Sequence, residues 1–130
     1  MSIDKNQQGL RDKYQAVYDR LLAMYGRPQW REHLPPMDEL VSTILSQSTS
    51  DINRDRGFNA LKERYSTWEE LLDAPVEEIV ATIYHAGLAN QKGPRIQEAL
   101  RFIAAERGEL SLDFLADIPV NEARAWLVQI

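Results

Sequence analysis

The sequence predicts an all-α fold, a compact bundle of about eight short helices in a single helical domain over residues 1–130. Apolar residues recur at three- and four-residue intervals nearly throughout, and no segment alternates with the two-residue period of a strand. Prolines, glycines and capping residues divide this pattern into short segments. With 44% hydrophobic and 27% charged residues, the composition is that of a folded domain rather than a disordered chain.

The first two helices are predicted from apolar stripes and from the residues that interrupt them. Residues 8–25 place leucine, tyrosine and valine side chains on one helix face, and Gly26 and Pro28 end this helix. A pair of prolines opens the second helix, whose apolar face extends from Met37 to Ser48. Both segments therefore have the pattern of helices that cover a core on one side.

The middle of the chain predicts three further helices. The third spans residues 51–65, and Gly57 in its interior predicts that a neighbouring element packs closely there. Residues 67–70 read Thr-Trp-Glu-Glu, a capping box that begins a short fourth helix. The fifth begins with Pro75 and carries an apolar stripe as far as Ile83.

The final third of the chain predicts one long helix and two short elements. The helical pattern breaks over residues 84–90 and resumes over 91–107, where Gly108 is the expected C-cap. Ser111 caps a short turn, and a last amphipathic helix covers 119–130. This helix ends the chain without a polar cap, so we expect the sequence to be truncated.

Composition excludes several kinds of site. The chain has no cysteine, which rules out a disulfide scaffold, a thiolate metal site and a cysteine nucleophile within it. The net charge of −5 argues against a generic basic coat for nucleic acid. No apolar run reaches the roughly 20 residues of a transmembrane helix, and the N-terminus lacks a signal-peptide core. We therefore expect a cytoplasmic protein without membrane partners.

Two loops carry the candidate binding chemistry, because no nucleophile–base pair or catalytic motif is evident. Residues 46–51 read Ser-Gln-Ser-Thr-Ser-Asp, which suits either ordinary helix capping or contact with a phosphate or a base edge. Residues 87–93 read Gly-Leu-Ala-Asn-Gln-Lys-Gly, and Leu88 either plugs the core or protrudes as an apolar wedge. Lys92 and Arg95 oppose the dipole of the following helix, which favours an approaching phosphate.

These two loops resemble those of a known family. The runs Ile-Leu-Ser-Gln-Ser-Thr-Ser-Asp at 44–51 and Gly-Leu-Ala-Asn-Gln-Lys at 87–92, with the helix pattern between them, are similar to the endonuclease III-like branch of the helix-hairpin-helix (HhH-GPD) DNA glycosylases. The resemblance covers residues 10–130. It implies base-excision DNA repair, in which the enzyme flips a damaged base out of duplex DNA and cleaves its glycosidic bond, in some members with lyase activity at abasic sites.

The resemblance also implies roles for particular residues. Ser48 or its neighbour Gln47 would fill the gap left by the flipped base, and Leu88 would be the wedge beside the opposite strand. The DNA-binding residues expected from both loops are Gln47, Ser48, Thr49, Leu88, Ala89, Asn90, Lys92 and Arg95. Two positions depart from the family pattern, because Ser48 replaces a longer amide side chain and Ala89 replaces a frequent aromatic residue.

The family's catalytic residues are expected after Ile130. There a glycine-rich hairpin, a catalytic lysine, a catalytic aspartate and usually four cysteines for a [4Fe-4S] cluster would follow. The resemblance thus implies an N-terminal fragment with no catalytic residue and no cofactor of its own, inactive alone and weak in binding double-stranded DNA. The [4Fe-4S] cluster would belong to the full-length parent. A non-enzymatic helical protein-interaction domain is the alternative function.

Two apolar stripes would lack their family partners in such a fragment. The N-terminal helix, within residues 1–26, packs in the family against the C-terminal part, and the last helix packs beside the hairpin. We expect the chain to cover these stripes by forming a homodimer, with folding back or fraying of the end helices as the alternative.

Overall fold

The computed structural model describes residues 4–30 and 32–130, and the chain divides into two compact units, Met1–Glu32 and His33–Ile130. All regular secondary structure in the described residues is helical, which confirms the all-α prediction. Within residues 4–30 and 32–130 there are seven α-helices and two short 3-10 helices, labelled η, where the sequence predicted about eight helices. The single 1–130 domain stays a prediction, and residues 1–3 of the expected N-terminal segment lie outside the described residues.

The first unit contains one helix, α1 (Lys5–Tyr25). It begins before residue 8 because the Asp4 carboxylate accepts a hydrogen bond from the Asn6 backbone N–H at 3.2 Å, which caps the helix. Gly26, with φ of 73°, ends it as the sequence predicted. No residue of α1 is buried. The exposed apolar residues of α1 include Leu10, Tyr14, Val17, Tyr18, Leu21 and Met24.

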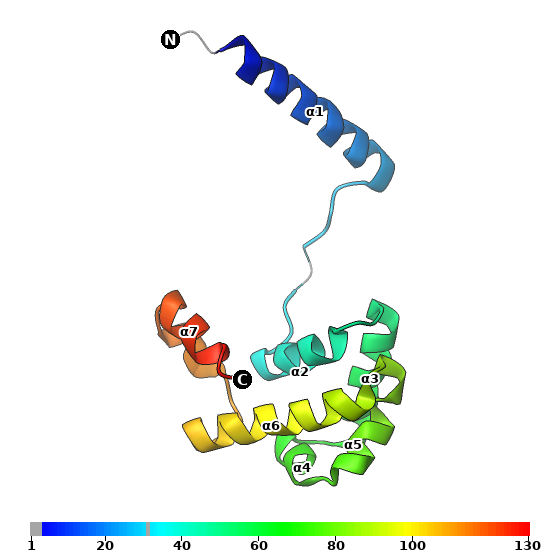
Figure 1. Ribbon diagram of the computed structural model, residues 1–130, viewed down its shortest axis with the longest axis vertical. Helices are drawn as coiled ribbons and strands as arrows, with labels where there is room; N and C mark the ends of the chain where they lie inside the picture. The colour runs from blue at the N-terminus through cyan, green and yellow to red at the C-terminus, as the bar shows by residue number, and fades with distance from the viewer. Residues whose placement is uncertain (1–3, 31) are drawn as a thin grey trace. The chain divides into compact units, whose positions relative to one another are not determined.

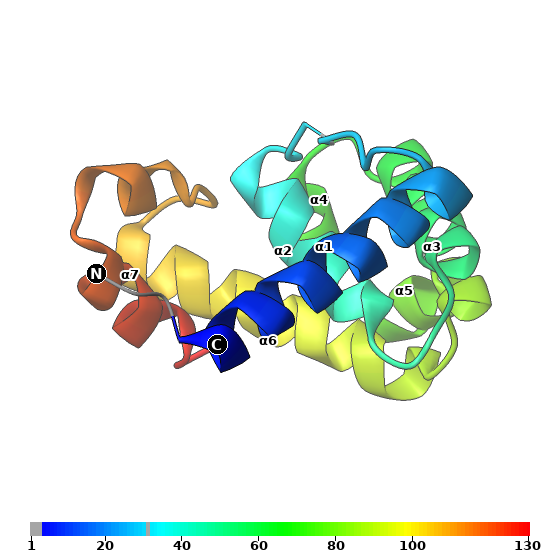
Figure 2. The ribbon, with the colours of Figure 1, turned by 90° about the horizontal axis from the view of Figure 1, so that it is seen from above.

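The second unit holds the remaining elements. They are α2 (Pro36–Ser46), α3 (Asp51–Arg64), α4 (Trp68–Asp73), α5 (Val76–Thr82), η1 (Tyr84–Ala86), α6 (Ala89–Arg107), η2 (Asp113–Asp117) and α7 (Val120–Leu127). Within this unit α6 is central, because α2 packs on one side of it and α4 and α5 pack on the other (Figure 1). The view from above shows α7 beside the C-terminal half of α6 (Figure 2).

One apolar core holds the second unit together. Its fully buried side chains include Leu45, Leu61, Leu71, Ile79, Ile83, Ile96, Leu100 and Ile103. The predicted close approach at Gly57 is confirmed, since a Cβ built there would lie 2.9 Å from the Cβ of Ala86. The interior of α3 therefore packs directly on η1.

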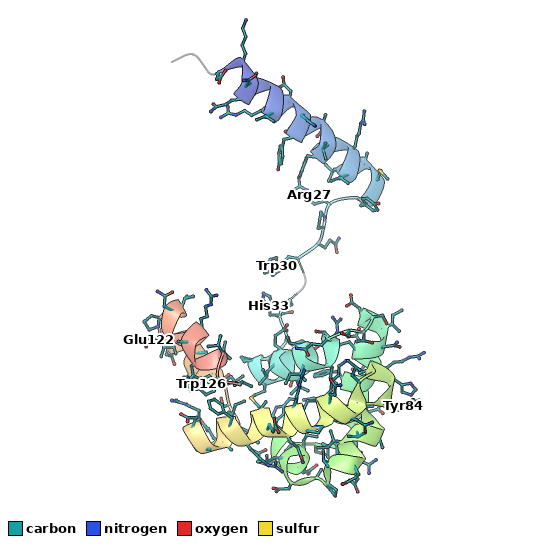
Figure 3. The ribbon with its side chains drawn as sticks, viewed as in Figure 1. Arg27, Trp30, His33, Tyr84, Glu122 and Trp126 are labelled. Atoms are coloured by element: carbon teal, nitrogen blue, oxygen red, sulfur yellow. The ribbon has the colours of Figure 1, made fainter. Side chains whose placement is uncertain are left out.

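The last helix, α7, is shorter than the sequence predicted. The last helix ends at Leu127 rather than at Ile130. It is anchored by Trp126, labelled in Figure 3, whose ring lies 5.4 Å from that of Phe102 and 4.9 Å from that of Phe114, measured between centroids. No helix of the described residues is long and apolar enough to cross a membrane.

Candidate nucleic-acid interface

The two loops singled out in the sequence share an unusual backbone conformation. Ser48, between α2 and α3, has φ of 54°, and Leu88, between η1 and α6, has φ of 50°. Among the described residues these are the two non-glycine residues with positive φ. The left-handed region costs an L-residue about 1–2 kcal/mol and is found where the surroundings impose it, often at functional sites. The strained backbone therefore falls on Ser48, one of the two candidate gap fillers, and on Leu88, the expected wedge.

Leu88 protrudes from its loop. Its side chain is half exposed, whereas Ala89 beside it is buried, so the geometry favours the wedge over the core plug. The Leu88 carbonyl accepts hydrogen bonds from the backbone N–H groups of Gln91 and Lys92, at 3.0 and 2.9 Å. For this reason α6 begins at Ala89 rather than at the predicted residue 91, and the first turn of a long helix fixes the position of Leu88.

Capping occupies the flanks of the first loop. The Ser50 hydroxyl accepts a hydrogen bond from the Asn53 backbone N–H at 3.2 Å, and the Ser46 hydroxyl donates to the Thr43 carbonyl at 2.6 Å. The capping interpretation thus accounts for these two serines. Between them, Gln47 and Ser48 are exposed and Thr49 is half-buried, which leaves the middle of the loop as the part that a ligand can reach.

The start of α3 is acidic rather than anion-binding. Asp51 and Asp55 each form an ion pair of 3.0 Å with Arg54, and the hydrogen bond that Arg54 Nε donates to Asp55 is the largest of the effects that raise the pKa of Arg54. Of the two, Asp51 lies in the first turn, where its carboxylate already complements the helix N-terminus. The interpretation of this terminus as a phosphate site is therefore not supported.

Arg95 connects α6, the helix that follows the second loop, to the first loop. From the exposed side of α6 its Nη1 donates a hydrogen bond of 3.0 Å to Oε1 of Gln47. Two predicted site residues 48 positions apart in sequence are thereby in contact. A guanidinium has five N–H donors in a planar fork, so Arg95 can hold Gln47 and still contact a phosphate.

Lys92 has a different role from the one that the sequence suggested. Only 1% of its surface is exposed, and its ammonium donates hydrogen bonds of 2.8 Å to the carbonyls of Leu45 and Ala86. Burial lowers the pKa of this amine, because desolvation disfavours the charged form. A side chain so enclosed does not reach a phosphate, and the expected phosphate contact by Lys92 is therefore wrong in this structure.

Two hollows adjoin the loops. One, of about 500 Å³, lies beside Gln47 and Arg95 and is also lined by Phe102 and Ile130. The other, of about 750 Å³, borders the second loop. Its lining includes Asn53, Tyr84, His85, Leu88 and Asn90. No signal in the sequence selected Tyr84, an exposed aromatic residue at the outer edge of the second unit (Figure 3). Exposed aromatic and amide groups around a protruding leucine suit contact with nucleobases.

Comparison with known proteins identifies the family to which the chain belongs. Residues 41–127 match the HhH-GPD superfamily of base excision DNA repair proteins, and this region contains both loops. The chain therefore belongs to the HhH-GPD superfamily. The resemblance of the two loops to this family and the prediction of a DNA repair protein are confirmed.

Several relatives share this region. A protein of Arabidopsis thaliana whose name places it among the DNA glycosylases is 35% identical over 91 residues, which cover 70% of this chain and 31% of the relative. Endonuclease III of Thermotoga maritima is 33% identical over 91 residues, which cover 70% of this chain and 43% of the relative. The chain thus spans less than half the length of these two relatives.

Proposed function

We propose that this chain supplies the surface with which a base-excision DNA glycosylase probes duplex DNA for damage. The observation that carries the proposal is the pair of exposed left-handed residues, Ser48 and Leu88, together with the contact between Gln47 of the first loop and Arg95 of α6, the helix that follows the second loop. Family membership supports the class of reaction, and the geometry of the loops supports the manner of DNA contact.

The side chains suit the separate parts of a base-flipping event. Gln47 or Ser48 enters the space that opens when a base flips out and offers hydrogen bonds to the base left behind, while the apolar Leu88 enters the stack as a wedge beside the opposite strand. Arg95 neutralises a phosphate nearby. The hollow of about 500 Å³ beside Gln47 adjoins these groups. Thr49 and Asn90 flank these groups and complete the proposed DNA contacts, with Ala89 as a buried support.

The catalytic step and the cofactor are proposed for a longer parent protein. No cysteine occurs in the sequence, and no cluster of metal-ligating side chains is found in the described ranges, so this chain does not fit a [4Fe-4S] cluster. Glycosidic cleavage, any lyase activity and the cluster would therefore depend on residues outside this chain. A cytoplasmic location stays a prediction. Self-association also stays a prediction, because no observation identifies a second copy as the partner that covers the stripe of α1.

The proposal is tested by comparing two duplexes that differ at one position. The chain should bind a duplex with a tetrahydrofuran abasic analogue more tightly than the intact duplex in fluorescence anisotropy, and both affinities should be weak and fall with salt. Each phosphate contact contributes about 0.9 to the slope of log K against log salt, so Arg95→Gln should reduce that slope by about one contact. Arg101→Gln, an exposed change farther along α6, is the matched control.

The outcomes separate the proposal from its alternative. Equal affinity for both duplexes would contradict lesion probing. No binding at the lowest salt concentration would favour the non-enzymatic interaction domain.

We also expect no covalent chemistry from this chain alone. Borohydride treatment with abasic-site DNA should give no trapped adduct, because a Schiff base needs an accessible amine and Lys92, the lysine nearest the loops, is enclosed and doubly hydrogen-bonded. The measurement is a shift of the labelled DNA on a denaturing gel, with a bifunctional glycosylase as positive control. A specific adduct at one lysine would contradict this expectation.

A further inference from the structure

The buried ammonium of Lys92 connects the main chains that lead into the two loops. It lies 2.8 Å from the carbonyl oxygen of Leu45 and 2.8 Å from that of Ala86, so the two oxygens are no more than twice that distance apart. Leu45 precedes Ser48 by three residues, and Ala86 precedes Leu88 by two. One side chain is therefore hydrogen-bonded to the backbone just before each of the two strained residues.

The two carbonyls are groups that need such a donor. Leu45 lies in the last turn of α2 and Ala86 is the last residue of η1, and the final carbonyls of a helix have no partner within it. The partial negative charge at these two ends favours a cation between them. Among the described residues Lys92 is the one buried basic side chain, and none of the ion pairs found there includes it.

A second buried donor on α6 serves for comparison. Gln97 is also buried, and its amide donates to the carbonyls of Leu72 and Ala74 at 3.3 and 2.6 Å. It connects α6 to the end of α4, in the same manner but away from both loops. Removing the Gln97 amide therefore shows the effect of losing two buried hydrogen bonds away from the loops. Removing the Lys92 ammonium shows the effect of the same loss beside them.

We propose that Lys92 is a positioning residue that sets the spacing between the Ser48 loop and the Leu88 loop, so that wedge and gap filler enter the duplex together. This inference rests on the proposed function for its consequence in DNA binding, but the geometry of the loops can be tested without DNA. Lys92 itself does not touch the DNA, and it acts through the two carbonyls.

The test compares Lys92→Met with Gln97→Met. Hydrogen exchange of backbone amides, measured by NMR without DNA, should accelerate by about tenfold over residues 46–50 and 86–90 in Lys92→Met. Gln97→Met should accelerate exchange around residues 72–75 and leave the two loops unchanged. In anisotropy, Lys92→Met should lower the preference for the abasic duplex by about tenfold, and Gln97→Met should keep it within about twofold of the original ratio.

A coupling measurement distinguishes positioning from general destabilisation. If Lys92 acts through the wedge, Lys92→Met should cause little further loss of abasic preference when added to Leu88→Ala. Unchanged loop exchange in Lys92→Met, equal loss of preference in Lys92→Met and Gln97→Met, or additive losses with Leu88→Ala would each overturn the inference.

The test still gives a result if Lys92→Met fails to fold or if the unaltered chain shows no preference for the abasic duplex. If Lys92→Met does not fold, Lys92→Leu, which also removes the donor, is measured in the same way against the same criteria. If the unaltered chain shows no abasic preference, the proposed function fails, while the exchange data still decide whether Lys92 sets the geometry of the loops.

Discussion

Leu88→Ala should lower the preference of this chain for an abasic duplex over an intact one by about tenfold or more. Full burial of a leucine side chain contributes about 1.5–3 kcal/mol, and alanine retains only a small part of its surface. Each 1.4 kcal/mol changes an equilibrium constant about tenfold. The loss should concentrate on the damaged duplex, because the wedge gains its contacts only where the stack is open. The measurement is the ratio of the two dissociation constants by anisotropy at one low salt concentration.

Two control variants isolate the wedge. Leu88→Met keeps an apolar side chain of similar length and should retain most of the preference. Val120→Ala, which shortens a more exposed apolar residue on α7, should change neither affinity. An equal loss of affinity for both duplexes in Leu88→Ala would show that the residue supports the loop rather than recognising the lesion.

Gly57→Val should destabilise the His33–Ile130 unit by about 1–3 kcal/mol, the range for overpacking a filled core. The new Cβ would lie 2.9 Å from the Cβ of Ala86, and neither atom can rotate away because each is attached directly to the main chain. Valine improves helix propensity over glycine by only a few tenths of a kcal/mol, which does not offset the clash. Urea unfolding followed by circular dichroism measures the difference.

The control for Gly57→Val lies on the same helix. Asn59→Val introduces the same side chain at an exposed position of α3 and should change the free energy of unfolding by less than about 0.5 kcal/mol. Similar losses in both variants would mean that the valine, rather than the contact with η1, is responsible.

Local sequence signals predicted most of this fold. Apolar spacing identified the helices. Capping residues, whose effect is local in sequence, located many of the helix ends, as at Gly26 and Gly108. The misplaced ends depend on other interactions. The start of α6 is set by the left-handed turn at Leu88, and the last helix ends at Leu127 although its apolar pattern continues.

The candidate site was predicted in part, through the resemblance of its two loops. The prediction misplaced Lys92, because a lysine in a polar loop before a helix has the same sequence pattern whether it faces solvent or bonds two carbonyls. One of these carbonyls, that of Leu45, lies 47 positions away. The contact between Arg95 and Gln47 was missed for the same reason, since no local pattern reports an approach between distant segments.

The left-handed residues also bear on how this domain could be engineered for thermostability. Glycine adopts positive φ without the steric cost of a side chain. A search for substitutions that raise the free energy of unfolding would therefore select glycine at positions 48 and 88. Glycine at these positions would make the two loops more flexible. The loops would then lose more conformational entropy on binding, which their fixed shape now limits. Substitutions such as Gly9→Ala, at a helix position with open space around it, offer stability without that trade-off.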